Sequence, residues 1–249
     1  MQKSGIEWCD YTSNPVKGYC PMGCSYCYAR RIYDRFKWDK TIRFVPKEFE
    51  EWGKAKAGSK IFVGSMIELF GKWVNDDWLE EIFKYTKYHP DLTFQFLTKQ
   101  PQNLIKFSPF PDNCWVGVTA TDRDSYNNAV WYLKDVSAKV RFLSFEPLLD
   151  NPVAGILDNR HSWPVMYGSI LQDVIDWLII GAQTKPTVMP KLEWVKEIVE
   201  AADSAGVPVF LKNNLAPLLS GHPEFWEDIP QGDHPNYESI AELRQEVPK

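Results

Sequence analysis

Six short apolar segments, separated by stretches of helical pattern, restrict the fold of this chain more than any other feature of its sequence. Each segment is rich in Val, Ile, Phe or Trp, which is typical of strands that are buried on both faces of a sheet. The segments are KIFVGSM (60–66), LTFQFLT (92–98), CWVGVT (114–119), VRFLSFE (140–146), WLIIGA (177–182) and VPVFLK (207–212).

Helical patterns occupy several of the intervals between these segments. Apolar residues recur at helical spacing in residues 76–88, 124–136 and 192–205, and Gly206 supplies a stop for the third helix. Alternation of strands and helices predicts right-handed βαβ units and a parallel sheet. A series of such units closes fully or in part, so the predicted fold class is α/β, a full or partial (βα) TIM-like barrel in a single domain.

Both ends of the chain and one internal stretch depart from this pattern. Residues 5–10 are predicted to form the first strand, followed by a cysteine-containing loop at 18–30 that leads into a helix near residues 28–36. The barrel is predicted to span residues 1–216. The stretch at about 150–174 contains Gly, Pro and His and is interpreted as an insertion, with a lid over the site as one interpretation. Residues 217–249 are predicted to be an irregular C-terminal extension.

Composition excludes some classes of protein. The net charge is −5 over 249 residues, whereas proteins that wrap duplex nucleic acid carry a basic surplus. No apolar run reaches the roughly 18 residues of a membrane span, and the N-terminal segment lacks the apolar core of a signal peptide. The expected location is therefore the cytoplasm, where thiols stay reduced and no membrane partner is needed.

Three of the five cysteines, Cys20, Cys24 and Cys27, lie in the segment GYCPMGCSYCYAR. In a reducing compartment this clustering indicates metal binding rather than disulfides. Three thiolates on one short loop can hold three corners of a [4Fe–4S] cluster and leave the fourth iron without a protein ligand. S-adenosylmethionine (SAM) can chelate that iron through its amino and carboxylate groups. An electron from the cluster can then cleave the sulfonium bond and give a 5′-deoxyadenosyl radical.

Two other interpretations of these cysteines stay open. A structural zinc site needs four ligands, and Cys9 could be the fourth, although the chain has no second C-x2-C pair and its four His lack ligand spacing. The three thiols could also bind nothing. Cys9 and Cys114 fall in predicted strands and are interpreted as small buried residues.

The cysteine loop resembles that of the radical SAM superfamily, whose signature combines this spacing with an aromatic residue before the third cysteine, here Tyr26. The resemblance implies that Tyr26 packs near the adenine of SAM. It also implies a full or partial (βα) barrel in which the cluster loop follows the first strand. In that superfamily, the position of Gly64, Ser65 and Met66 usually offers backbone acceptors to the SAM amino group.

A closer resemblance is carried by short motifs at the predicted strand ends. Together with SNPVKGYCPMGCSYCYA, these motifs resemble a phage- and prophage-associated family of radical-SAM-like three-cysteine proteins. The motifs are VGSMIELF (63–70), FLTKQP (96–101), VGVTA (116–120), FLSFEPLL (142–149) and FLKNN (210–214). The chain departs from that family at residues 181–183, where Gly-Ala-Gln replaces Gly-Gly-Glu, so a role that needs a carboxylate there does not carry over.

Polar residues at the predicted strand ends complete the candidate site. In a parallel barrel the active site lies at the carboxyl ends of the strands, so these residues are expected to converge on the face that carries the cluster loop. Lys99 and Glu146 are predicted to be catalytic, Lys99 as the partner of a carboxylate or substrate anion and Glu146 as an acceptor from ribose or substrate. Glu68 either faces this site or solvates the start of a helix. The other predicted cofactor-binding residues are Thr98, Thr119, Ser144 and Gln183, and Lys212 lies at the same edge.

These features predict a radical SAM enzyme that abstracts a hydrogen atom from a small-molecule or nucleotide substrate and takes electrons from an external donor. The phage resemblance favours a DNA base as the substrate, as in DNA base hypermodification, and would place the protein in the host cytoplasm. The alternative is a non-catalytic iron–sulfur or zinc protein that binds nucleic acid or a partner. The stretch RRIYDRFKWDK (30–40) is interpreted as a solvated helix face, or else as a contact for phosphate or a nucleobase.

Overall fold

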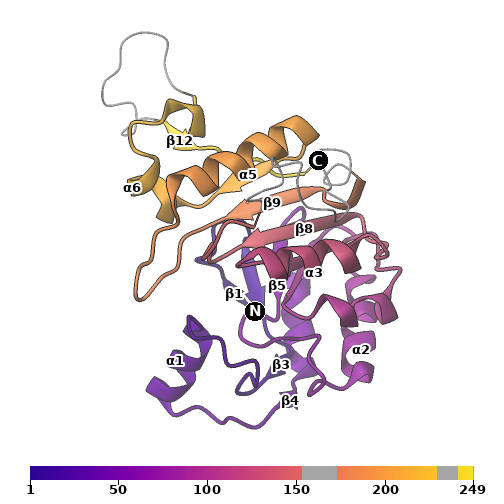
Figure 1. Ribbon diagram of the computed structural model, residues 1–249. Coiled ribbons are helices and arrows are strands. Elements are labelled where there is room, and N and C mark those ends of the chain that lie inside the picture. Colours follow the sequence, from indigo (N-terminus) through magenta and orange to yellow (C-terminus); the bar gives the residue numbers. More distant parts are fainter. Residues whose placement is uncertain (153–172, 229–240, 249) are drawn as a thin grey trace. The chain divides into compact units, whose positions relative to one another are not determined.

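A computed structural model describes residues 1–152, 173–228 and 241–248 of the chain (Figure 1). The chain falls into two compact units. Unit 1 comprises Met1–Val118 and Trp131–Arg141, and unit 2 comprises Thr119–Val130 and Phe142–Lys249. Each unit contains parallel β-strands and helices, so the predicted α/β class is confirmed, whereas closure into a barrel stays a prediction.

The sheet of unit 1 follows the strand order β1-β2-β5-β6-β7. β1 pairs antiparallel with β2, whereas β2 with β5, β5 with β6, and β6 with β7 all pair in parallel. Parallel pairing brings the carboxyl ends of these strands to one edge of the sheet. The strands are β1 (Gln2–Lys3), β2 (Tyr11–Ser13), β5 (Lys60–Val63), β6 (Thr93–Thr98) and β7 (Cys114–Thr119).

The prediction of a first strand over residues 5–10 is wrong. The Ser4 hydroxyl accepts a hydrogen bond of 2.8 Å from the Ile6 amide, and the Cys9 amide donates to the Ile6 carbonyl at 3.3 Å. These bonds fold the segment into a turn, as a serine hydroxyl near a glycine favours. Trp8 lies on this turn and its side chain is buried, with its ring centre 4.8 Å from that of Phe62. The apolar character of Trp8 therefore reflects packing rather than a strand.

Two helices of unit 1 form where helical patterns predicted them. α1 spans Tyr28–Phe36 as predicted, and α2 (Asp76–Thr86) ends two residues before the predicted boundary. The Asn75 side chain accepts from the Asp77 amide and caps α2. The shorter elements of this unit are β3 (Val16–Lys17), which pairs with β4 (Arg43–Phe44), and the 3-10 helices η1 (Pro46–Lys54), η2 (Pro101–Asn103) and η3 (Ile105–Phe107).

Unit 2 follows the strand order β8-β9-β10, in which both pairs are parallel. α5 (Leu192–Ala205) has the predicted bounds and ends at Gly206, whose φ of 67° lies in the left-handed region that a helix stop requires. α3 (Arg123–Leu133) forms at the remaining helical pattern. The strands are β8 (Val140–Phe145), β9 (Trp177–Ile180) and β10 (Val209–Leu211).

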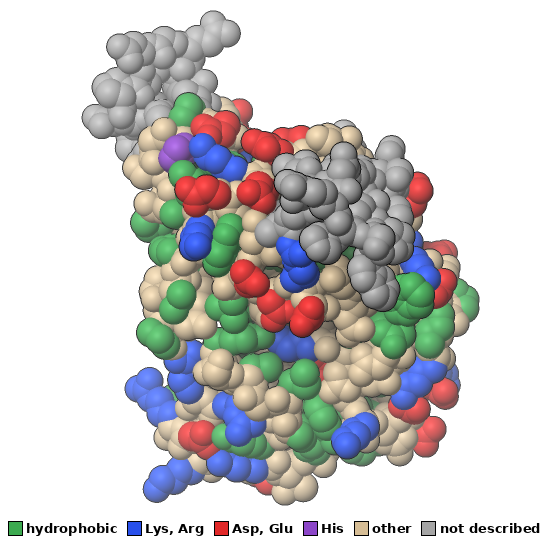
Figure 2. Space-filling model, viewed as in Figure 1, with side chains coloured by type: hydrophobic (Ala, Val, Ile, Leu, Met, Phe, Trp, Pro, Cys, Tyr) green, Lys and Arg blue, Asp and Glu red, His purple; other side chains and the backbone are tan. Residues whose placement is uncertain are grey.

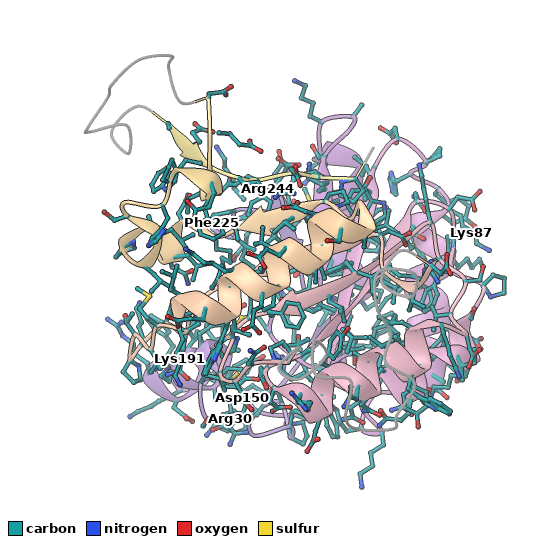
Figure 3. The ribbon with its side chains drawn as sticks, turned by 45° about the horizontal axis from the view of Figure 1, so that its top comes forward. Arg30, Lys87, Asp150, Lys191, Phe225 and Arg244 are labelled. Carbon is teal, nitrogen blue, oxygen red and sulfur yellow. The ribbon has the colours of Figure 1, made fainter. Side chains whose placement is uncertain are left out.

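The predicted insertion and extension are described only in part, because residues 153–172 and 229–240 lie outside the described residues. In the described part of the C-terminal region, Arg244 lies beside α5 (Figure 3), with its guanidinium 2.7 Å from the Asp203 carboxylate. The short elements of this region are η4 (Asn213–Leu215), α6 (Ala216–Leu219), η5 (Pro223–Phe225), and β11 (Trp226–Glu227), which pairs with β12 (Glu242–Leu243).

Within residues 1–152, 173–228 and 241–248, no helix combines the length and the apolar composition that crossing a bilayer requires.

Candidate functional site

The cysteine loop is fixed by close backbone contacts with the segment that follows α1. Gly18 has a φ of 139°, and a Cβ at this position would lie 2.6 Å from the Cα of Ile42, so this close approach requires glycine. The Gly18 amide donates to the Tyr33 hydroxyl at 2.8 Å, and the Tyr19 amide donates to the Lys40 carbonyl. The loop that carries the three cysteines is therefore anchored before the first of them.

The three thiols differ in their surroundings. Cys20 is buried, and its Sγ accepts a hydrogen bond of 3.5 Å from the Glu68 amide. Burial raises the pKa of the Cys20 thiol above its usual value, although the backbone amides of Glu68 and Met22 act in the opposite direction. Cys24 and Cys27 are partly exposed, and Cys27 immediately precedes α1.

Glu68 joins the cysteine loop to the carboxyl ends of two strands. Its carboxylate accepts from the Thr98 hydroxyl at 2.6 Å and from the Lys99 amide at 2.7 Å, both at the end of β6. It also accepts from the Phe70 amide. Glu68 follows β5, which is the parallel neighbour of β6. Cys20 therefore lies at the carboxyl edge of these strands, and Glu68 neither solvates a helix nor lies at the surface.

The turn after β5, residues 64–66, is held by neighbouring polar groups. Asn14 accepts from the Met66 amide at 3.0 Å and contacts the Ser65 hydroxyl, whereas the Tyr28 hydroxyl donates to the Ser65 carbonyl at 2.7 Å. Gly64 has a φ of 83°, and a Cβ there would lie 2.4 Å from the Leu69 side chain. The predicted backbone acceptors thus sit in a fixed turn that also contacts the first residue of α1.

Lys99 and Tyr26 lie together, as the prediction of a shared site requires. The Lys99 ammonium is 5.9 Å from the centre of the Tyr26 ring. Thr98 is buried, where its hydroxyl donates to Glu68 and accepts from the Gln100 amide at 2.9 Å. In unit 1 the structure therefore brings Cys20, Tyr26 and Lys99 to one edge, while Thr98 serves Glu68.

A second polar cluster lies at the carboxyl ends of the strands of unit 2. Glu146 follows β8 and pairs with Lys212, which follows β10, at 2.6 Å, and the Ser144 hydroxyl donates to the other carboxylate oxygen at 3.0 Å. The side chains of both charged residues are less than one-fifth exposed. Gly181 follows β9 between them, and a Cβ there would lie 2.9 Å from the Lys212 side chain. Glycine at this position therefore makes room for the ion pair.

Thr119 ends β7, and Gln183 lies in the turn that follows β9. Thr119 is buried at the end of β7, and the next amide, that of Ala120, donates to the Ser144 carbonyl at 3.0 Å. The Gln183 side chain donates to the Pro186 carbonyl, within its own turn. Asn214 exchanges two hydrogen bonds with the backbone of Ala182, at 3.1 and 2.9 Å.

Sequence reasoning left the place of Glu68 open and did not single out Asn14 or Asn214, and these three residues organise the two edges. Asn14, Glu68 and Asn214 each bind backbone groups just beyond a strand. Glu68 could have been recognised because a carboxylate flanked by Ile67, Leu69 and Phe70 must be buried with partners. The sequence offers no comparable signal for the two asparagines, because this residue type is common in ordinary turns.

The sequence matches, over residues 3–216, a family described as "Protein of unknown function (DUF5131)". The chain belongs to this family. The matched range includes the cysteine loop, Glu68 and the Ser144–Glu146–Lys212 cluster. No curated protein matches the chain.

The remaining cysteines lie away from the loop, at the opposite edge of the unit 1 sheet. Cys9 precedes β2 and its thiol contacts the Ser4 hydroxyl, while Cys114 begins β7 and contacts the Thr86 hydroxyl. A strand of four residues such as β5 is about 10 Å long, which separates Cys9 from Cys20. Burial raises the pKa of Cys114 to about 12, as suits an inert core thiol.

Cys20, Cys24 and Cys27 are the thiols of this loop that could hold an iron–sulfur cluster or a zinc ion. Among the described residues, no three His, Cys, Asp or Glu side chains are gathered as a metal-binding group. The donor chemistry supports the cluster, because Cys20, Cys24 and Cys27 are free thiols on one short loop and backbone amides of the kind that stabilise ligating sulfur approach Cys20. The position of Cys9 does not supply a fourth thiol to this loop.

Proposed function

We propose that this protein is a radical SAM enzyme with a full or partial (βα) barrel, whose [4Fe–4S] cluster is held by Cys20, Cys24 and Cys27. The reaction would remove a hydrogen atom from a nucleotide or nucleobase substrate. One observation carries the proposal: the Cys20 thiol is bound by Glu68, the residue that ties together the carboxyl ends of two parallel strands. In α/β enzymes that edge holds the active site.

Cys20, Cys24 and Cys27 would hold the cluster, which when bound would supply one-electron reduction of SAM, with electrons from an external reductant, and through it abstraction of a hydrogen atom from the substrate. The protein's own part is to hold and orient these groups. Three cysteines leave one iron position for the amino and carboxylate groups of SAM. Burial of Cys20 keeps water from one side of the loop.

Lys99 and Tyr26 would orient SAM beside the loop. The Lys99 ammonium can pair with the SAM carboxylate, and the Tyr26 ring offers a face for the adenine. The backbone of Lys99 is fixed by its amide bond to Glu68, so its side chain starts from a defined point. In this proposal Glu68 is a positioning residue, because its carboxylate is already occupied by three donors.

The side chains of Ser144, Glu146 and Lys212 in unit 2 would bind polar groups of a ligand. Ser144 and Lys212 hold the Glu146 carboxylate from two sides, which leaves it suited to accept from a ribose or substrate hydroxyl through its remaining lone pairs. Lys212 neutralises its charge, so accepting such a bond does not require an isolated buried anion.

Anaerobic reconstitution with iron and sulfide tests the proposal. The protein should take up about four iron ions per chain, absorb broadly in the visible range, and release 5′-deoxyadenosine when reduced in the presence of SAM. Cys24→Ser should abolish both the cluster and the product, whereas Cys9→Ser should retain both. Stoichiometric zinc without SAM binding, or a fully loaded cluster that gives no 5′-deoxyadenosine, would overturn the proposal.

A further inference from the structure

The segment that begins in α1, residues 30–43, presents aromatic rings to solvent. Every residue from Asp34 to Thr41 is exposed, including Phe36 at 57% and Trp38 at 49%. The rings of Phe36 and Trp38 are stacked, with centres 5.9 Å apart and planes 25° apart. Two adjacent exposed rings form a contiguous apolar patch, unlike a single exposed ring such as Trp131, and such patches are candidate binding sites.

The same segment is positively charged, whereas the chain as a whole is negatively charged. Residues 30–43 contain six Lys or Arg and two Asp, a net charge of +4 in a protein whose overall charge is −5. Asp34 is paired with Lys40, and Asp39 is paired with Arg43, so the surface keeps a surplus of four cations over its carboxylates. Figure 2 shows the blue side chains gathered at the lower left, over α1 and the segment that follows it.

The backbone holds this surface in shape. Lys37 ends α1 with a φ of 51°, a left-handed conformation that costs a lysine more than it would cost glycine. The Trp38 amide then donates to the Tyr33 carbonyl at 3.1 Å, and the Trp38 ring packs edge-on against Tyr33. This turn places the Trp38 ring beside the Phe36 ring. Lys37, the residue between them in the sequence, adds a cation at the same turn.

We propose that this surface, residues 30–43, binds single-stranded DNA. Unpaired bases stack on exposed aromatic rings, and the phosphates between them need cations at short intervals, which is the combination found here. Duplex DNA hides the faces of its bases and therefore could not use the rings. The two carboxylates of the surface are paired with their own cations, so they do not cancel the other four cations. The choice of DNA over RNA follows from the proposed function, for which a DNA base is the expected substrate, and a matched RNA oligomer is tested beside it.

The surface is continuous with the cysteine loop. The Arg30 guanidinium lies 4.1 Å from the centre of the Tyr19 ring and donates to the Cys20 carbonyl at 2.7 Å. A strand bound along residues 30–43 would thus reach the loop that the proposed function assigns to the cluster. This inference rests on that function for its purpose, a DNA base as substrate, but binding itself can be measured without any radical chemistry.

Fluorescence anisotropy with a labelled thymidine oligomer of about 20 nucleotides tests the inference on the full chain after anaerobic reconstitution. Phe36→Ala and Trp38→Ala should each weaken binding by about tenfold, because each removes a stacking face. The double variant Arg35→Gln/Lys37→Asn should lower the slope of log affinity against log salt by about 1.4, since each lost phosphate contact contributes about 0.7. Asn tolerates the left-handed backbone at position 37, so the charge is removed without strain.

Trp131 and Lys134 provide a matched control. Trp131 is 61% exposed, and the Lys134 ammonium lies 3.7 Å from its ring centre, so the chemistry is the same at a different place. Trp131→Ala should leave the affinity unchanged. Phe36→Ala, which removes the more exposed ring, should keep the thermal unfolding midpoint of the wild type within a few degrees.

Three results would overturn the inference: no binding at low salt, equal loss of affinity in Trp131→Ala, or tighter binding to duplex DNA or to an RNA oligomer of matched sequence. Formation of 5′-deoxyadenosine, measured in the same preparations without DNA, separates the two proposals. If the product forms and DNA does not bind, this inference fails alone. If DNA binds and the product never forms, the proposed function fails instead.

Discussion

Two carboxylates, the buried Glu68 in unit 1 and the partly buried Glu146 in unit 2, follow parallel strands yet are satisfied in different ways. Glu68 accepts from two backbone amides, which cannot leave without moving the backbone, and from a buried hydroxyl. The partners of Glu146 include the side chains of Ser144 and Lys212, which can rotate away. The first arrangement builds a rigid frame for the cysteine loop, and the second leaves a carboxylate that can exchange partners with a ligand.

The largest effect is expected from removing the Glu68 carboxylate. Glu68→Ala would leave the Thr98 hydroxyl and two backbone amides without their hydrogen-bond acceptor in a buried site. This should lower the free energy of unfolding by about 3 kcal/mol or more. Glu68→Gln keeps one acceptor oxygen and should cost less. Urea unfolding measures both, and a loss below about 1 kcal/mol for Glu68→Ala would show that the frame is not rigid.

The turn that carries Glu68 gives a second test of rigidity. Gly64→Ala combines a left-handed backbone with a clash against buried Leu69 and should destabilise by about 2–4 kcal/mol. Gly58 has the same φ of 83° but no atom within 4 Å of its Cβ position, so Gly58→Ala should cost only about 1 kcal/mol. Equal losses in the free energy of unfolding for the two variants would mean that the turn after β5 shifts at little cost to accommodate a Cβ.

The exchangeable pair should give a smaller effect. In a double-mutant cycle on Glu146→Gln and Lys212→Met, the coupling energy in the free protein should be about 1 kcal/mol, because the pair is mostly buried but still in contact with water. A coupling above about 3 kcal/mol would place Glu146 with Glu68 as a fixed structural group. Ser144→Ala serves as the control that removes only the neutral donor.

The smallest effect concerns a third carboxylate, Glu48, which pairs with Lys17 at 2.7 Å and with the Met1 amine at 2.9 Å. Burial raises the pKa of Glu48, but the two neighbouring cations lower this pKa by more than burial raises it. The pKa of Glu48 therefore lies below its usual value. The stability it contributes is therefore present above pH 4.5 and is lost as the pH falls through the lowered pKa.

Acid titration of unfolding at pH 5 and pH 3 checks this expectation. The wild type should lose up to about 1 kcal/mol more than Glu48→Gln between these two values. Identical pH dependence in the two proteins would show that the ion pairs of Glu48 do not stabilise the fold.

Much of the fold could be predicted because the buried strands and amphipathic helices are encoded locally. The segment CWVGVT became β7 with its predicted bounds, and α1 and α5 also formed as predicted. The error at residues 5–10 arose because Trp8 is buried from a turn, and apolar character alone does not distinguish a turn from a strand.

The candidate site was less accessible to sequence reasoning. The cysteines are recognisable from their spacing, and the grouping of Ser144 with Glu146 followed from strand ends. The burial of Glu68 could be predicted but its distant partners could not, because the Thr98 hydroxyl and the Lys99 amide come from the end of β6, about 30 residues later in the chain. Pairings between distant segments set such contacts, and the local sequence does not state which segments pair.

The central claim is that the Cys20, Cys24 and Cys27 loop holds a cluster with one iron left for SAM. Low-temperature electron paramagnetic resonance of the reduced, reconstituted protein tests it most directly. The account predicts a [4Fe–4S]⁺ signal that changes shape when SAM is added, in the wild type and in Cys9→Ser alike. A signal that SAM leaves unaltered, or a change that disappears in Cys9→Ser, would contradict it.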